Sequence, residues 1–317
     1  MLRALPQAGS APVLPMRSVR GPGPQGRNAM DTPELAVAAT RPIALDWAAA
    51  APVVRERHWQ RVHGDASLAA WLAPLAPTHL HFGSEFCEHL LPSPRALREA
   101  VRQAGAHGLR FALLTPVASP GVIERLDALL PMLADGMEVV ANDWGVAHLV
   151  ATRFPSLGLV AGRVLCRMTK DPRLDAGWAG RCGHALAAPT MRALFERLGI
   201  RRLELDMPVF PAEEAFDGLP LPAGVHLPFV YVAKGRMCRA GSLSMTGPER
   251  FAVGRRCQKE CLRLSAAASR PGREDACSAV QLGNTLFSRH SSEMADALRR
   301  EAGMGRVARL VVAGESL

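Results

Sequence analysis

The sequence has no long apolar run. Hydrophobic residues make up 48% of its 317 residues, but they come in short segments, and none approaches the roughly 18 consecutive apolar residues that a membrane-spanning helix needs. The first 30 residues also lack the continuous apolar segment of a secretory signal. We therefore expect a protein that has no membrane span and that works in the cytoplasm.

Lysine and tyrosine are scarce. The only lysines are Lys170, Lys234 and Lys259, there is a single tyrosine, and the net charge of +9 comes from arginines scattered in short groups. A nucleic-acid-binding surface usually combines a basic run with aromatic side chains that stack on bases. The charge therefore keeps RNA binding as an alternative, but it does not make RNA binding the leading hypothesis.

A disulfide framework is not expected either. The seven cysteines are an odd number in a mid-sized chain without a secretory signal, so reduced thiols fit better. We interpret Cys166 and Cys182 as small buried or loop residues. The remaining five are the candidates for chemistry: Cys87, Cys238, Cys257, Cys261 and Cys277.

Short apolar runs alternate with helical stretches along most of the chain. Residues 1–40 are rich in Pro, Gly and Ala and lack periodicity, which predicts a disordered extension. Repeated strand and helix units over residues 41–317 predict an α/β fold, a regular or distorted TIM-like (β/α)8 barrel, with an irregular cysteine-bearing loop at 235–280. The expected strands are 43–45, 79–82, 109–114, 137–141, 157–161, 202–205 and 225–231.

Polar residues follow several of these strands, where barrels place their functional side chains. A guanidinium such as that of Arg163 could clamp an anion in bidentate fashion, whereas Asn142 and Asp143 could contact a substrate or cap the next helix. Glu204 and Asp206 alternate along one strand, so they point to the same side. The candidate substrate-binding residues are Glu85, Asn142, Asp143, Arg163, Asp206 and His226.

Three cysteines are clustered in the expected loop. Cys257 and Cys261 lie four residues apart, and Cys238 lies 19 residues before them. Grouped thiolates usually hold an iron-sulfur cluster or a zinc ion, although structural zinc sites more often have Cys-x-x-Cys pairs. The fourth ligand is either Cys87, which follows an expected strand, or Cys277, which lies in the same loop.

At these positions the chain resembles the collagenase-like peptidase family U-32, and within it the UbiV-type proteins. The resemblance rests on HLHFGSEFCEHL at 79–90, on the His-Leu-Pro segment 226–229 that leads to Cys238, on the Cys-x-x-x-Cys pair, and on Leu-Gly-Asn-Thr at 282–285. It covers roughly residues 41–314 in the same order.

The resemblance implies a 4Fe-4S cluster held by Cys87, Cys238, Cys257 and Cys261, with Cys277 as the reserve ligand. It also implies anaerobic, oxygen-independent hydroxylation in ubiquinone biosynthesis, with a small-molecule hydroxyl donor such as prephenate and a heteromeric partner of the UbiU type. The alternatives are an RNA-modifying member that hydroxylates tRNA or rRNA, a non-enzymatic redox scaffold, and a peptidase. Peptidase activity is disfavoured because the sequence has no His-Glu-x-x-His or Gly-x-Ser-x-Gly motif.

Overall fold

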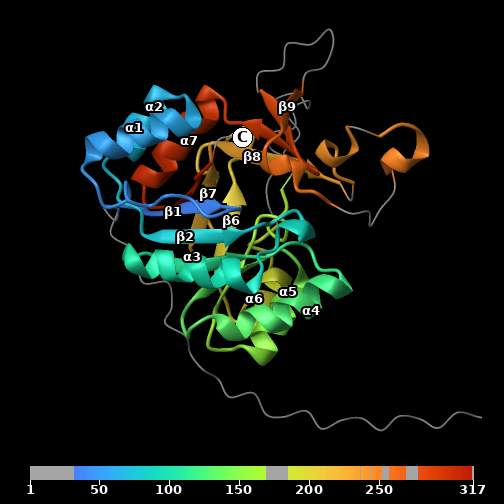
Figure 1. Ribbon diagram of the computed structural model, residues 1–317. Helices are drawn as coiled ribbons and strands as arrows, with labels where there is room; N and C mark the ends of the chain where they lie inside the picture. The colour runs from blue at the N-terminus through green and yellow to red at the C-terminus, as the bar shows by residue number, and fades with distance from the viewer. Residues whose placement is uncertain are drawn as a thin grey trace, which may run out of the picture.

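Eight parallel strands close into a barrel in the computed structural model, which describes residues 32–168, 185–235, 237–243, 245–251, 257–268 and 278–315 (Figure 1). The strand order around the barrel is β1-β12-β7-β6-β5-β4-β3-β2. With helices between most successive strands, the architecture is the expected TIM-like (β/α)8 barrel. The strands are β1 Glu34–Ala39, β2 His79–Gly83, β3 Arg110–Leu114, β4 Glu138–Ala141, β5 Gly158–Ala161, β6 Ile200–Asp206, β7 Ala223–Leu227 and β12 Val307–Ala313.

Local capping signals explain where the helices begin. Ser93 and Ser119 each precede a proline, and each accepts a hydrogen bond from the backbone of the first helical turn. At other helices Asp65, Asp143 and Ser291 accept a corresponding hydrogen bond without a following proline. The α-helices are α1 Pro52–His63, α2 Ala66–Leu72, α3 Pro94–Ala106, α4 Pro120–Leu129, α5 Trp144–Arg153, α6 Pro189–Leu198 and α7 Ser292–Gly303. None of these described helices is long and apolar enough to cross a membrane.

The start of the fold differs from the sequence prediction. Residues 34–39, which we expected to be disordered, form β1, while 43–45 are not a strand. β1 pairs with β12 on one side and β2 on the other, so it closes the barrel. Its burial explains the apolar run Glu-Leu-Ala-Val-Ala-Ala, and it moves the start of the barrel from residue 41 to Glu34.

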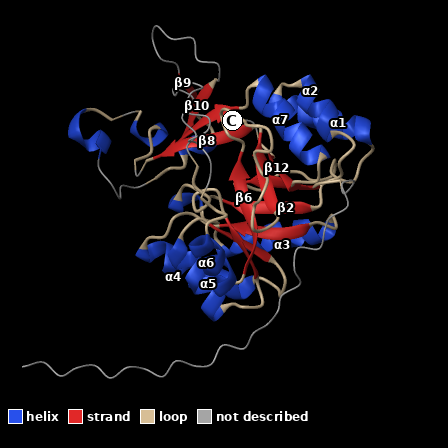
Figure 2. Ribbon diagram, turned by 180° about the vertical axis from the view of Figure 1, so that it is seen from behind, coloured by secondary structure: helices blue, strands red, loops and turns tan. Residues whose placement is uncertain are grey.

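The segment 235–280, which was expected to be one irregular loop, contributes β9 and the start of β10 to a second sheet. The expected strand 225–231 divides at Pro228 into β7 and β8, and β8 pairs with β11 in an antiparallel sheet of order β8-β11-β10-β9. Figure 2 shows this small sheet beside the barrel, and Arg289 of its strand β11 donates to the His63 carbonyl at the end of α1. Its strands are β8 Phe229–Lys234, β9 Ser265–Ala268, β10 Ala279–Leu282 and β11 Thr285–Arg289.

Short 3-10 turns complete the described elements. They are η1 Glu88–Leu90, η2 Leu130–Met132, η4 Ala240–Ser242, η5 Gly247–Phe251 and η6 Glu260–Leu262.

The barrel buries apolar residues on its outside and many polar residues inside. The main core lies between the strands and their helices and includes Leu35, Leu113 and Leu205. Inside the barrel, a small apolar layer includes Ala112 and Val160. Much of the rest of the lumen is lined by charged and imidazole side chains, and buried charges of this kind require partners.

Candidate functional site

Four cysteines meet at one cavity of about 170 Å³. Cys87 follows β2, Cys238 follows β8, and Cys257 and Cys261 lie at the turn before β9, so segments about 150 residues apart contribute to one lining. The structure thus brings Cys87 together with the three clustered cysteines, as the resemblance implied. Cys277 and Cys182 lie outside the described residues, and Cys166 is buried with its thiol against the Ala161 carbonyl.

The thiols of this cavity have unequal acidity. A hydrogen bond from Cys261, opposed by burial, lowers the pKa of Cys238 to about 6 with help from the Gly241 amide. The same bond and burial raise the pKa of Cys261, and burial raises the pKa of Cys87. These contacts favour the thiolate form of Cys238, which is the form that binds a metal.

The turn between β10 and β11 ties the cysteine segments to the barrel. Asn284 donates through Nδ2 to the Phe86 carbonyl at 2.8 Å and to the Gly235 carbonyl at 3.0 Å. Gly283 has a φ of +58°, and a Cβ at this position would meet the Cβ of Cys261 at 3.1 Å. The Leu-Gly-Asn-Thr segment recognised in the sequence therefore holds the Cys87 loop and packs closely against Cys261.

The loop after β2 is also anchored by a buried ion triad. Arg163 pairs with Glu85 through Nε and Nη2, and its Nη1 donates to Asp206 Oδ1 at 2.8 Å. The guanidinium also lies over the rings of Phe86 and Tyr231. Because both carboxylates already pair with Arg163, an incoming anion would have to displace one of them to use the clamp expected from the sequence.

The two candidate substrate-binding residues that follow β4, Asn142 and Asp143, make hydrogen bonds to nearby backbone groups. Asn142 joins two strand ends, because its Nδ2 donates to the Thr115 carbonyl and its Oδ1 accepts from the Val164 amide. Asp143 caps α5 by accepting from the Gly145 amide at 2.7 Å, which agrees with the helix-cap alternative. Both lie outside the group of described residues that line the cysteine cavity, whereas Glu85, Arg163 and His226 line it.

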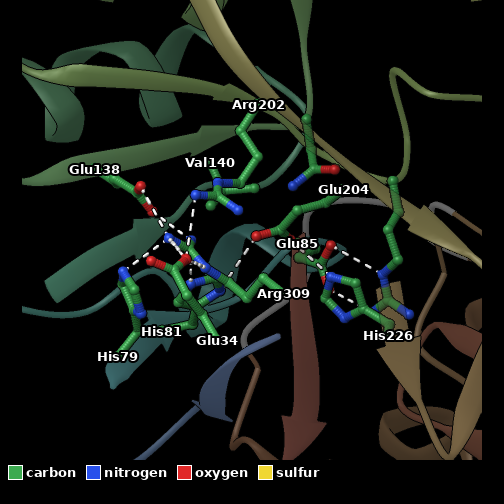
Figure 3. A network of polar contacts seen from close by, with 12 residues as sticks. Glu34, His79, His81, Glu85, Glu138, Val140, Arg202, Glu204, His226 and Arg309 are labelled. Carbon is green, nitrogen blue, oxygen red and sulfur yellow. Dashed lines mark hydrogen bonds and ion pairs between the residues drawn. The ribbon is translucent and has the colours of Figure 1, made fainter. Parts of the chain in front are cut away.

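A chain of polar contacts continues from the cavity into the barrel lumen. His226 Nε2 lies 2.7 Å from Glu204 Oε2, and the other oxygen of Glu204 lies 3.3 Å from His81 Nδ1. Figure 3 follows the contacts from His226 through Glu204 and His81 to Arg309. The sequence predicted that Glu204 and Asp206 share a side, and both are indeed buried inside the barrel.

Arg309 determines how these imidazoles carry their protons. The Arg309 guanidinium has hydrogen-bond donors but no acceptor atom. His81 Nε2 lies 3.3 Å and His79 Nε2 lies 2.7 Å from its Nη atoms, so both ring nitrogens must accept a hydrogen bond from Arg309. The proton of neutral His81 therefore lies on Nδ1, on the side of Glu204, although the 3.3 Å contact between them does not have hydrogen-bond geometry. Burial, partly opposed by Glu204, lowers the pKa of His81 to about 3, while burial raises the pKa of Glu204 despite its cationic neighbours.

This series of polar contacts ends at Arg309, near the N-terminal ends of the barrel strands. Arg309 pairs there with Glu138 at 2.6 Å and with Glu34 at 3.0 Å, and Arg110 and Arg202 also contact Glu34. This end of a barrel usually serves stability. Sequence reasoning did not identify Arg309, because its partners come from β1, β2 and β4 and are brought together only by closure of the barrel.

The spacing of candidate ligands separates two kinds of metal site. A tetrahedral zinc site with Zn–S bonds of about 2.3 Å places its sulfurs about 3.8 Å apart. Among the described residues, one group of three ligand atoms lies within 4.8 Å of one another, and it belongs to Glu85, Glu204 and His226. No three cysteine sulfurs of these residues lie that close together. The four thiols surround a cavity instead of converging on a single point.

The fold and the site together define a TIM-like barrel protein with an inserted antiparallel sheet, a cysteine-lined cavity and a polar lumen. No protein-family model matches the chain, and no curated protein matches it.

Proposed function

We propose that this chain is a cytoplasmic 4Fe-4S protein of the UbiV type within family U-32, which assists an oxygen-independent hydroxylation such as that of ubiquinone biosynthesis. The observation that carries the proposal is the cavity lined by Cys87, Cys238, Cys257 and Cys261. It lies at the end of the barrel where active sites occur.

The cavity supports a cluster better than it supports a single zinc ion. Its volume of about 170 Å³ exceeds by several times the share of about 30 Å³ that one water molecule takes in the liquid, whereas a structural zinc ion fills the space between its four ligands. Among the described residues no three cysteine sulfurs lie within 4.8 Å of one another, which supports the same choice. A bound cluster would supply one electron at a time.

Aromatic side chains next to the thiols suit a small ring compound as the second occupant. Phe86, Phe229 and Phe287 line the cavity, and the Phe86 ring lies 5.0 Å from that of Tyr231 and 5.5 Å from that of Phe287. Such a wall offers apolar surface and ring edges to a planar or cyclic molecule. This fits a cyclic hydroxyl donor or the ring that is hydroxylated.

The test is anaerobic purification followed by iron and acid-labile sulfide analysis of the wild type, Cys87→Ala and Cys277→Ala. We expect about four iron atoms per chain in the wild type, loss of iron in Cys87→Ala, and retention of iron in Cys277→Ala, which is the matched control. A colourless protein that contains zinc, or full iron in Cys87→Ala, would contradict the proposal.

The heteromeric partner and the RNA alternative can be distinguished in binding assays. A partner of the UbiU type should co-purify with the tagged chain. The net charge of +9 favours the RNA-modifying alternative, for which affinity should fall steeply as salt rises. If RNA does not bind even at low salt, that alternative is excluded.

A further inference from the structure

We propose that His226 transfers a proton to and from the molecule bound in the cysteine cavity, and that Glu204 is the residue that positions it. This inference rests on the proposed function, because it assigns a role at the same site. His226 is the imidazole that joins the cavity to the polar lumen: it lines the cavity and contacts Glu204.

The barrel register places this pair. His226 lies on β7 opposite Asp206 of β6, and Glu204 lies two residues earlier on β6, so both side chains face the lumen. The 2.7 Å contact joins His226 Nε2 to Glu204 Oε2. A carboxylate that orients an imidazole and stabilises its protonated form is the arrangement used in acid–base catalysis.

Glu204 lies among other buried polar groups. Its second oxygen, Oε1, lies 3.3 Å from His81 Nδ1 without a hydrogen bond between them, so this contact is electrostatic, while Arg309 donates to His81 Nε2. Glu204 and His81 are both completely buried. Such support keeps the carboxylate from rotating away when His226 gains charge, and it requires no rearrangement of solvent.

A bound cation accounts less well for the close arrangement of Glu204 and His226. The ligand atoms of Glu85, Glu204 and His226 lie within 4.8 Å of one another, but both oxygens of Glu85 already accept from Arg163. A metal ion here would face that guanidinium. The titratable and charged groups around His226, taken from every neighbouring element, are His81, Glu85, Arg163, Glu204, Asp206, His290 and Arg309.

The proton balance of the step is simple. The imidazole takes a proton from a hydroxyl or an acidic C–H group of the bound molecule, and an imidazolium paired with the Glu204 carboxylate results. The same proton returns to the product, so the step consumes no electrons and no net protons.

The test compares His226→Gln, Glu204→Gln and His63→Gln in anaerobically purified protein. Glutamine at 226 can still donate to Glu204 but cannot take up a proton, so hydroxylation should fall about 100-fold to 10,000-fold with iron content and far-UV circular dichroism unchanged. His63 is a buried histidine next to Trp59, outside the residues that line the cavity. The variant His63→Gln should therefore keep wild-type activity.

A second measurement does not depend on hydroxylation. The Cε1–H resonance of His226, assigned by its absence from His226→Gln, is followed against pH by NMR with histidine-selective labelling. Glu204 favours the imidazolium, so Glu204→Gln should lower the midpoint by about one pH unit or more, and the activity rise that needs neutral His226 should move to lower pH.

The outcomes separate the two proposals. An unchanged midpoint in Glu204→Gln refutes the coupling of the pair, and full activity in His226→Gln refutes the catalytic role. Loss of iron in His226→Gln would show a structural role instead. If the wild type holds no iron and hydroxylates nothing, the proposed function fails and with it the catalytic role, whereas the shifted midpoint would still establish the pair.

Discussion

Replacing Arg163 by methionine should destabilise the protein strongly, because it leaves two buried carboxylates without a counter-charge. The side chains of Arg163 and Glu85 are each 6% exposed and that of Asp206 is fully buried. Removing one partner of a buried pair costs about 3–5 kcal/mol. Since a domain is stable by about 5–15 kcal/mol, Arg163→Met should remain folded but with a much smaller margin.

The measurement is urea unfolding of both proteins under anaerobic conditions, followed by circular dichroism at pH 8 and at pH 5. The penalty should shrink at pH 5, because protonation removes the charge of an unpaired buried carboxylate. Arg102→Met is the matched control: its pair with Glu99 is 67% and 41% exposed, and an exposed pair contributes about 0–1 kcal/mol. If Arg163→Met costs no more than this control, or if its penalty grows at low pH, the reasoning about the triad is wrong.

Two further predictions concern the cavity wall and the base of the barrel. Gly283→Ala should reduce iron content without unfolding the barrel because its Cβ would press on Cys261, whereas Gly199→Ala, with a similar φ of +67° and nothing within 4 Å of the added Cβ, should keep its iron; equal iron in both variants would contradict the packing argument. At Glu34, burial opposes ionisation but Arg309 and Arg202 prevail and lower its pKa from 4.5 to about 2, so its charge stabilises the fold above about pH 4.5. Glu34→Gln should therefore unfold more easily than the wild type at neutral pH, and the difference, measured by urea unfolding, should vanish as the pH falls toward 2.

The barrel could be predicted from the sequence because its strands are buried on both faces. Such strands appear as continuous apolar runs separated by capped helices, and most expected strands lie close to the observed ones. β1 was missed because it follows a Pro/Gly-rich stretch and resembles it in alanine content. β9, with the sequence Ser-Ala-Ala-Ala, has almost no intrinsic strand signal, so only its pairing with β10 makes it a strand.

The sequence predicted the residues that line the cavity better than it predicted the contacts among the buried residues beneath them. Cysteine type and position nominated Cys238, Cys257 and Cys261 and left Cys87 and Cys277 as alternatives for the fourth ligand, and the resemblance to family U-32 favoured Cys87. Alternation also predicted that Glu204 and Asp206 face one side, but it cannot name partners across the barrel, because those depend on register and closure. The pairing of Arg163 with two carboxylates and the contact between His226 and Glu204 are therefore visible only in the folded chain.

Cys87 is the distant member of the cysteine set, and the barrel already places it. The loop that carries it is fixed at Glu85 by Arg163 and at the Phe86 carbonyl by Asn284, and the Cys87 amide itself donates to Ser84 Oγ. Closing a loop of about 150 residues around a cluster would otherwise carry an entropic cost. The folded barrel already fixes the position of this loop, so Cys87 would be a preorganised ligand for the proposed cluster, and the Asn284 contact to Phe86 joins the inserted sheet to the same loop.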